Sequence, residues 1–325
     1  MRKVSVHIVT FNSQVYIASC LEAIFRQSCS IERIIIVDNA STDQTLDRLS
    51  PYEDRVDIIR NDMNVGFAEA HNQAIAFSDS DYYLVLNPDV CLDEHYIARI
   101  VNFLDSNPDV GSATGKLLLS SNHSIIDSTG LVMKKSRRAF DRGAGEATEH
   151  WNASAYVFGV SGAAAIYASS MVRAISIDGQ FFDEDFFAYK EDVDVAWRAR
   201  VLGWKSYYCA DAVAYHARGW QQGKRNKQPL YIRKHSYINR YYMLIKNESV
   251  LSYAAHFPFI IAYDLASLGY LLVREPRVLI VWFSLFKRIP SMLRKRKHIK
   301  YKRKSSKPAN SWYTTSNSKS VSKGD

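Results

Sequence analysis

Short apolar runs that end in polar residues alternate with helix-like segments over the first hundred residues. The runs have the length and β-branched content of strands, and the segments between them have the spacing of helices. Strands are expected at residues 4–9, 34–37, 56–60 and 82–86, and helices at 15–26, 67–77, 93–106 and a short one ending at about Leu49, N-capped by Ser41 or Thr42. This alternation predicts an α/β fold with a mostly parallel sheet.

Beyond residue 110 the pattern becomes less regular. Strands are expected near 113–119, 130–133, 156–160, 163–167 and 207–209, and a helix at 190–202, bounded by Gly203. The basic segment 134–146 contains two glycines and reads as a long loop, of the kind that is often functional.

A third type of pattern begins at Pro229. A Tyr-rich helix is expected at 230–246, followed by strongly apolar runs at 251–273 and 278–286 and then a basic segment. His256, Pro258 and Asp264 interrupt the longer run, so it predicts interfacial helices rather than a membrane span, although a span and packing on the domain both remain open. We therefore divide the chain into a catalytic domain at 1–228, a helical, membrane-associated extension at 229–304 and a disordered tail at 305–325.

The formal net charge of +9 comes from the C-terminal residues and not from the body of the chain. Residues 287–325 hold 13 of the 42 Lys and Arg and one of the 33 acidic residues, which leaves 29 basic and 32 acidic residues in 1–286. A slightly acidic body argues against a nucleic-acid partner, and a basic segment after an apolar one favours an anionic membrane surface.

The four cysteines have no CxxC or CxxH spacing, so neither a zinc site nor a disulfide framework is indicated and a reducing cytoplasm fits best. The first twelve residues contain His7 and no small-residue cleavage site, so we expect a strand rather than a signal peptide.

Polar residues at the strand ends are the first candidates for chemistry. Ligands of open α/β sheets bind beyond the carboxyl ends of the strands. The residues at those positions are Thr10, Asn12, Asp38, Asn39, Asn87, Asp89 and His216. No GxGxxG or GxxxxGK[ST] motif follows the first strand, so a divalent cation is the simplest partner for substrate phosphates. Asp89 is a hard oxygen ligand for Mg²⁺ or Mn²⁺, although Asn-Pro-Asp is also a good turn sequence.

Residues 181–194 combine six acids with five aromatic side chains. In a helix that begins near Lys190, Glu191 and Asp194 share one face and Asp192 points elsewhere. Acids at a helix start can simply complement the helix dipole. Carboxyls beside aromatic rings are also candidates for a raised pKa and for base catalysis.

Seven motifs in series resemble the inverting family 2 glycosyltransferases with a GT-A fold, and among them the rhamnosyltransferase-like enzymes of bacterial surface polysaccharide assembly. They are VTFN (9–12), VDNASTD (37–43), NVGFAEAHN (64–72), LNPDV (86–90), SGAAA (161–165), FFAYKEDVDVAWRARVLGW (186–204) and AYHARG (214–219). The resemblance covers about residues 4–245.

The resemblance implies a role for each matching position. Thr10, Asn12 and Asp38 would form the nucleotide pocket, while Asn64, Gly66 and Asn72 would lie along the ribose and diphosphate. Ser161 and Gly162 would border a sugar, and Glu191 would contact substrate. Asp192 would be the catalytic base, and Asp89 and His216 would hold Mg²⁺ or Mn²⁺. Asn87 stands where the family's DxD motif has its first acid, so one negative charge is missing there.

The resemblance also implies the substrates. The expected donor is a nucleotide sugar, with dTDP-L-rhamnose first and UDP-linked sugars as the alternative, and the expected acceptor is a saccharide on a polyprenyl lipid at the inner face of the plasma membrane. Two other readings stay open: a nucleotidyltransferase, and a non-enzymatic protein that binds lipid or nucleic acid through its basic tail.

Overall fold

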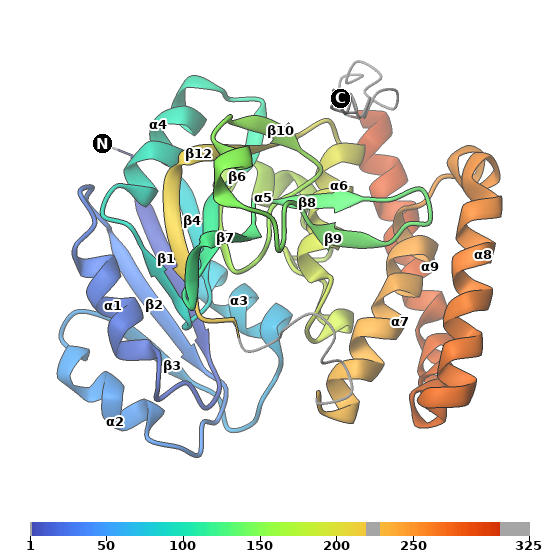
Figure 1. Cartoon of the computed structure of the whole chain (residues 1–325), viewed down its shortest axis with the longest axis horizontal. Coiled ribbons are helices and arrows are strands. Elements are labelled where there is room, and N and C mark those ends of the chain that lie inside the picture. The colour runs from blue at the N-terminus through green and yellow to red at the C-terminus, as the bar shows by residue number, and fades with distance from the viewer. Residues whose placement is uncertain (1, 219–227, 306–325) are drawn as a thin grey trace, which may run out of the picture.

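The computed structural model describes residues 2–218 and 228–305. Its centre is a mixed sheet with the strand order β10-β12-β6-β11-β4-β1-β2-β3, to which β5 adds beside β12 and β7 beside β6 (Figure 1). The strands are β1 (Val4–Thr10), β2 (Arg33–Asp38), β3 (Asp57–Arg60), β4 (Tyr82–Leu86), β5 (Val90–Leu92), β6 (Val110–Leu119), β7 (Asn122–Ser128), β10 (Ala155–Val157), β11 (Ala164–Ala168) and β12 (Lys205–His216).

The helices flank the sheet, as the sequence predicted. They are α1 (Ile17–Phe25), α2 (Thr45–Leu49), α3 (Phe67–Ala76), α4 (Tyr96–Ser106), α5 (Ser169–Ile175) and α6 (Glu191–Val201), followed in the extension by α7 (Leu230–Asn247), α8 (Val250–Arg274) and α9 (Trp282–Ser305). The mixed sheet with flanking helices and a helical extension is therefore confirmed, while β5, β7 and α5 were not predicted.

The first half of the sheet is parallel and sets the position of the polar strand ends. β1 pairs with β2 on one side and with β4 on the other, and both pairings are parallel. The central residues of β1, β2 and β4 are almost fully buried, because helices cover both faces of such a sheet. Thr10 and Asp38 are paired residues at the carboxyl ends of their strands, so their side chains meet at one edge.

The second half contains antiparallel strands that return to the same edge. The three residues of β5 pair antiparallel with the end of β12, and Val90 lies opposite His216. This pairing brings Asp89, for which the sequence left open a metal ligand and a turn residue, next to the last residue of β12.

Two local predictions were wrong. The segment 134–146 is not a continuous loop, because β8 (Leu131–Met133) and β9 (Ala139–Asp141) form a hairpin. Ser41 and Thr42 do not cap α2, which begins at Thr45. The hydroxyl and amide groups of Ser41 instead donate to Asp38 and so hold the loop after β2.

The extension packs on the catalytic domain through α7 and α9, which lie side by side at the end of the molecule opposite α1 and α2 (Figure 1). Side chains of α6, α7 and α9 share one hydrophobic cluster that includes Trp197, Ile238, Met243 and Met292. The basic segment that the sequence placed after the apolar runs is helical and forms most of α9. Residues 306–325 of the expected disordered tail lie outside the described residues.

Helix α8 differs from its neighbours in exposure. Of its 25 residues only Ile260 and Leu271 are buried, whereas Leu251, Leu265 and Val273 are 86%, 63% and 80% exposed. Within the described residues it is the single helix that has the length and apolar composition to cross a membrane.

Candidate active site

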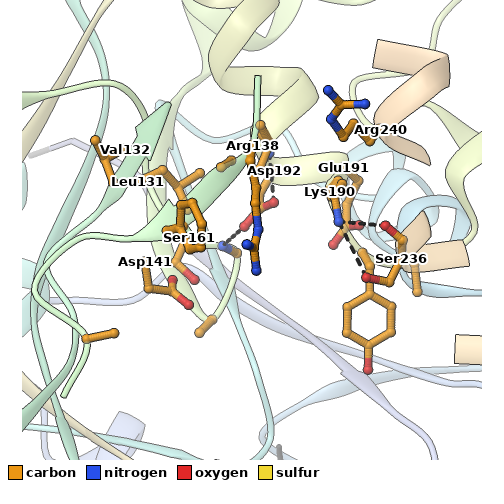
Figure 2. A pocket seen from close by; sticks show the side chains of 18 of the residues that line it. Leu131, Val132, Arg138, Asp141, Ser161, Lys190, Glu191, Asp192, Ser236 and Arg240 are labelled. Atoms are coloured by element: carbon orange, nitrogen blue, oxygen red, sulfur yellow. Dashed lines mark hydrogen bonds between the residues drawn. The ribbon is translucent and has the colours of Figure 1, made fainter. Parts of the chain in front are cut away.

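One cavity of about 1560 Å³ brings together residues from both halves of the chain. It lies between the carboxyl edge of the sheet, the β8–β9 hairpin, the start of α6, and helices α7 and α8. The predicted site residues that line it are Asn87, Asp89, Ser161, Gly162, Glu191, Asp192 and His216. In Figure 2, Ser161, Asp141, Arg138 and Asp192 gather on one side, and Lys190 and Ser236 lie on the other.

Asp89 and His216 are adjacent because of the β5–β12 pairing. The distance from Asp89 Oδ1 to His216 Nε2 is 3.3 Å. The second ring nitrogen, Nδ1, lies 2.7 Å from Asp127 Oδ2, and Arg218 donates to the other oxygen of Asp127. Burial lowers the pKa of His216, but the hydrogen bonds to Asp127 and Asp89 outweigh burial and raise it to about 9.

Once the imidazole has released its proton, this pair fits a divalent cation. A carboxylate oxygen and an imidazole nitrogen are suitable ligands for Mn²⁺ and, through the oxygen, for Mg²⁺, which both complete their shells with substrate phosphates and water. Asp127 holds the far side of the imidazole, as carboxylates do behind metal-binding histidines. Among residues 2–218 and 228–305, no group of three His, Cys, Asp or Glu side chains could hold a metal ion by itself.

Asp192 lies on the wall of the same cavity, at the second residue of α6. Its Oδ2 accepts a hydrogen bond of 3.1 Å from the backbone N–H of Gly162, and its Oδ1 accepts one of 2.7 Å from Val193. A Cβ at position 162 would stand 3.3 Å from the ring of Phe67 and 3.7 Å from Asp192 Cβ. Position 162 therefore has little room for a side chain, which explains a glycine beside the carboxylate.

Burial sets the acidity of the two neighbouring carboxyls. It raises the pKa of Asp192 to about 6, with part of the effect offset by the hydrogen bond from Gly162. Burial and the negative charge of Asp192 raise the pKa of Glu191 to about 8. Glu191 Oε2 is buried and has no hydrogen-bond partner among the described residues. Both carboxyls therefore keep their protons to a higher pH than an exposed carboxyl does.

The residues predicted for the nucleotide lie at the ends of β1 and β2 and do not line this cavity. Asp38 accepts from the Thr10 hydroxyl at 2.8 Å and from the hydroxyl and amide of Ser41. A carboxylate can accept about four hydrogen bonds. Asp38 accepts three in this structure, so one position remains for a further donor. Asn12 accepts from the backbone N–H of Thr42 at 2.8 Å, which fixes the rim of the same edge.

Four other predicted substrate residues also lie outside the cavity lining and form internal contacts. Asn39 donates to Gly66 O at 3.1 Å, and Asn64 accepts from the Gly66 N–H at 2.9 Å. The amide of Asn72 bonds with the backbone of Phe182 and with Glu184. Their side chains join the loop before α3 to the sheet and to the acidic segment.

Sequence reasoning missed several residues of the site. Asp127, which contacts His216, and Arg218, which also bridges to Asp141, are brought in by β7 and by the residues after β12. Arg138 and Arg142 of the hairpin region line the cavity. The sequence shows that residues 134–146 are basic. It does not show that Arg138 and Arg142 line the cavity.

Residues 5–143 match the model of the family described as Glycosyl transferase family 2. An uncharacterized glycosyltransferase of Haemophilus influenzae is 30% identical over 118 residues, covering 35% of this chain and 36% of the relative. A PGL/p-HBAD biosynthesis glycosyltransferase of Mycobacterium bovis is 28% identical over 123 residues, covering 37% and 48%. The chain thus spans about a third to a half of the length of these curated relatives. The matched family segment ends before Asp192 and His216.

The solved structures extend the likeness to the whole fold. The mannosyltransferase PcManGT from Pyrobaculum calidifontis, in complex with GDP-Man and Mn²⁺, is 14% identical with a TM-score of 0.55, covering 96% of this chain and 88% of that one. Residues 1–349 of S. aureus TarS are 15% identical with a TM-score of 0.56, covering 93% and 87%. At such identities the likeness establishes the fold, which is the GT-A fold that the motifs indicated.

Proposed function

We propose that this chain, whose residues 5–143 match the Glycosyl transferase family 2 model, is an inverting, metal-dependent glycosyltransferase. The observation that carries the proposal is that one cavity holds both the carboxylate of Asp192 and, separately, the adjacent side chains of Asp89 and His216, which have the chemistry of cation ligands. Inverting transfer requires a base on the acceptor and charge stabilisation on the leaving group.

The reaction is a single displacement. Asp192 accepts the proton of the acceptor hydroxyl while that oxygen forms a bond to the anomeric carbon of the donor sugar. The bond from this carbon to the diphosphate oxygen breaks, and the nucleoside diphosphate leaves with the electron pair. Because attack and departure occur on opposite faces, the configuration of the sugar is inverted.

Two further groups support this step. Asp89 and His216 would hold Mn²⁺ or Mg²⁺, which when bound neutralises the charge that develops on the diphosphate. Burial and the charge of Asp192 raise the pKa of Glu191, and its Oε2 has no hydrogen-bond partner among the described residues, so we assign its carboxyl to a contact with substrate. Asn87, in place of a first acid, lines the cavity without adding negative charge near the diphosphate.

The donor is a nucleotide sugar whose base lies against Asp38 at the edge of β1 and β2. We take dTDP-L-rhamnose as the first donor to test, on the motif resemblance, and UDP-linked sugars as the second class. PcManGT was solved with GDP-Man and GalNAc-T7 with UDP, so the shared fold accommodates different nucleotides.

A donor panel tests the function. Purified protein is incubated with dTDP-, UDP- and GDP-sugars and Mn²⁺ or Mg²⁺, with and without a saccharide acceptor, and products are identified by mass. We expect free nucleoside diphosphate and a glycosylated acceptor. Formation of a new sugar nucleotide with release of pyrophosphate would instead identify a nucleotidyltransferase.

The base assignment has a separate test. Asp192→Asn keeps the size of the side chain and removes the base, so transfer should fall by about 10²- to 10⁴-fold. Circular dichroism and thermal unfolding confirm that the variant is folded. Turnover at the wild-type rate would refute the role of Asp192.

We place the enzyme at the cytoplasmic face of a membrane, acting on a lipid-linked saccharide in bacterial surface glycan synthesis. A relative from Staphylococcus epidermidis is named a teichoic acid poly(glycerol phosphate) polymerase. The exposed apolar face of α8 supports this placement, because a helix so poorly covered by protein can bury its side chains in the headgroup region. The cavity is lined on one side by Tyr263 and Tyr270 of the same helix, so an acceptor held there would lie next to the bilayer.

Vesicle binding tests the membrane assignment. Simultaneous replacement of Leu251, Leu265 and Val273 by Gln should reduce co-sedimentation with phosphatidylglycerol vesicles at least about tenfold and leave turnover of a soluble acceptor unchanged. The matched control replaces Val15, Met63 and Phe77, which are exposed apolar residues far from α8 in sequence, and should bind as wild type does. Equal binding by both triple variants would refute the role of α8.

A further inference from the structure

The backbone that precedes Asp192 has an unusual conformation. Phe187, Tyr189 and Lys190 have φ values of 62°, 71° and 69°, and none of them is glycine. A bulky residue at positive φ has an energetic cost of about 1–3 kcal/mol, so such a segment persists only where its surroundings hold it. Lys190 is the residue immediately before α6, and Asp192 follows two positions later.

Asn239 of α7 holds this segment. Its side-chain nitrogen lies within hydrogen-bonding distance of three backbone carbonyls, those of Phe186 at 2.9 Å, Ala188 at 3.0 Å and Tyr189 at 2.7 Å. The amide has two N–H groups, so the three carbonyls share two donors. The residue is 0% exposed, so no water replaces these bonds if the amide is removed. One side chain of the extension therefore supplies the donors for the carbonyls of the segment that leads to Asp192.

Neighbouring contacts fix the two sides of the same segment. Lys190 Nζ donates to Ser236 O at 2.7 Å, a contact drawn in Figure 2. The ring of Phe187 stacks on His235 with centroids 5.0 Å apart. On the opposite side, Phe187 O accepts from the N–H of Ala68 in α3 at 3.1 Å. The segment is thus held between α7 and the first turn of α3.

We propose that Asn239 is a positioning residue for Asp192: by holding residues 186–190, it fixes the start of α6 so that the carboxylate stays against Gly162 and faces the acceptor hydroxyl. This inference rests on the proposed function of Asp192 as the base. A displacement of about 1 Å in a reacting group can cost about 10²-fold in rate, so a buried amide outside the cavity lining can govern turnover.

The test compares Asn239→Leu, which has nearly the same shape and no donor, with Asn239→Asp, which places acceptor oxygens against the three carbonyls. Ser112→Ala is the matched control, because it removes a buried hydrogen bond of 2.8 Å to Ser206 elsewhere in the sheet. We expect kcat to fall about 10²-fold in both Asn239 variants, the KM for the donor to stay within about twofold, and the control to keep wild-type kcat.

Hydrogen exchange provides a second readout that does not depend on activity. In the Asn239 variants, the amides of residues 187–192 should exchange at least about tenfold faster than in wild type, while those of β1 and β4 are unchanged. Ser112→Ala should leave residues 187–192 protected. A kcat within twofold of wild type, or unchanged exchange in this segment, would overturn the inference. Absence of transfer by the wild-type protein with every donor would refute the proposed function instead.

Discussion

Glu191 and Asp192 are neighbours in the chain but differ in their hydrogen bonds. Asp192 accepts two backbone N–H groups, which stabilise its charge, whereas Glu191 Oε2 has no partner among the described residues and lies beside a second negative charge. This difference supports the proposal that Asp192, and not Glu191, serves as the base.

The pH profile should report the ionisation of Asp192. Only the deprotonated carboxylate accepts a proton, and its pKa is raised to about 6, so kcat/KM should fall about tenfold per pH unit below pH 6 and level off above it. The measurement is a rate profile from pH 5 to 8 at saturating Mn²⁺, with circular dichroism at each pH as the control for folding. A profile that stays flat down to pH 5 would contradict this assignment.

Asp127 should affect metal binding without touching substrate. Its carboxylate lies 2.7 Å from His216 Nδ1, so Asp127→Asn removes the negative charge behind the imidazole. We expect the half-saturating Mn²⁺ concentration to rise about 10- to 100-fold, measured by titration of transfer rate and by calorimetry. Asp105→Asn, which alters a surface ion pair with Arg2, serves as the control. An unchanged Mn²⁺ titration in the Asp127 variant would remove His216 from the metal site.

At the scale of elements, the loop before α3 meets the segment before α6 at Gly66. This residue has φ of +91°, and a Cβ there would stand 2.6 Å from Phe187 O and from the Phe187 ring. The region expected to approach the donor and the region that carries the base are therefore in direct contact, and only a residue without a side chain fits between them.

Gly66→Ala should separate steric contact from backbone strain. Gly179 has a similar φ of +82° and nothing within 4 Å of an added Cβ, so Gly179→Ala is a control for strain alone. We expect Gly179→Ala to lose about 1 kcal/mol of unfolding free energy through strain alone. Gly66→Ala should lose more than this, and its kcat/KM should fall at least tenfold. Thermal unfolding and donor kinetics measure the two effects. Identical behaviour of the two variants would show that the contact with Phe187 is unimportant.

The sequence predicted elements whose pattern is local. The apolar runs of β1, β2 and β4 are long, alternate with helices and end in polar residues, so the sheet edge with Thr10, Asp38 and Asp89 followed from them. The three-residue strand β5 gives no such pattern, and the β8–β9 hairpin is hidden by the charges around its turn. Without β5, the sequence could propose Asp89 and His216 as partners only through motif resemblance.

The contacts of Asn239 and Asp127 were not predictable for a different reason. Asn239 reaches residues about 50 positions earlier, and Asp127 reaches one about 90 positions later. Neither residue belongs to a motif or to an apolar periodicity, and a buried asparagine looks like any other in sequence. Such side chains become visible only when the tertiary structure shows which backbone groups and ring atoms they satisfy.

For the molecule as a whole, buried charges join the extension to the catalytic domain. Lys246 of α7 pairs with Asp183 and with Asp194 at 2.8 Å, and Lys295 of α9 pairs with Asp183 and with Asp185 at 2.8 Å. Together they hold the pKa of Asp183 below its usual range, because these cations offset its burial. Some basic residues of α9 thus form internal ion pairs. The sequence analysis had assigned the whole basic segment to a membrane surface.

Removal of one cation should reveal this coupling. Lys295→Met should lower the free energy of unfolding by about 3 kcal/mol, because it leaves buried carboxylates with less compensation. Lys300→Met changes an exposed lysine on the same helix and should alter stability by less than about 0.5 kcal/mol. Urea unfolding gives both values. Equal stability of the two variants would contradict the claim that the ion pairs of Lys295 couple α9 to the catalytic domain.

The pairing of Val90 with His216 has a consequence for how the protein is made. Asp89 is translated early, its imidazole partner comes more than a hundred residues later, and Asn239 follows in the next helix. A nascent chain that ends before β12 therefore has Asp89 without His216, and one that ends before α7 lacks the amide that contacts the carbonyls of residues 186, 188 and 189. The two ends of the cavity thus depend on late-synthesised residues, and the proposed site can be assembled only after α7 has left the ribosome.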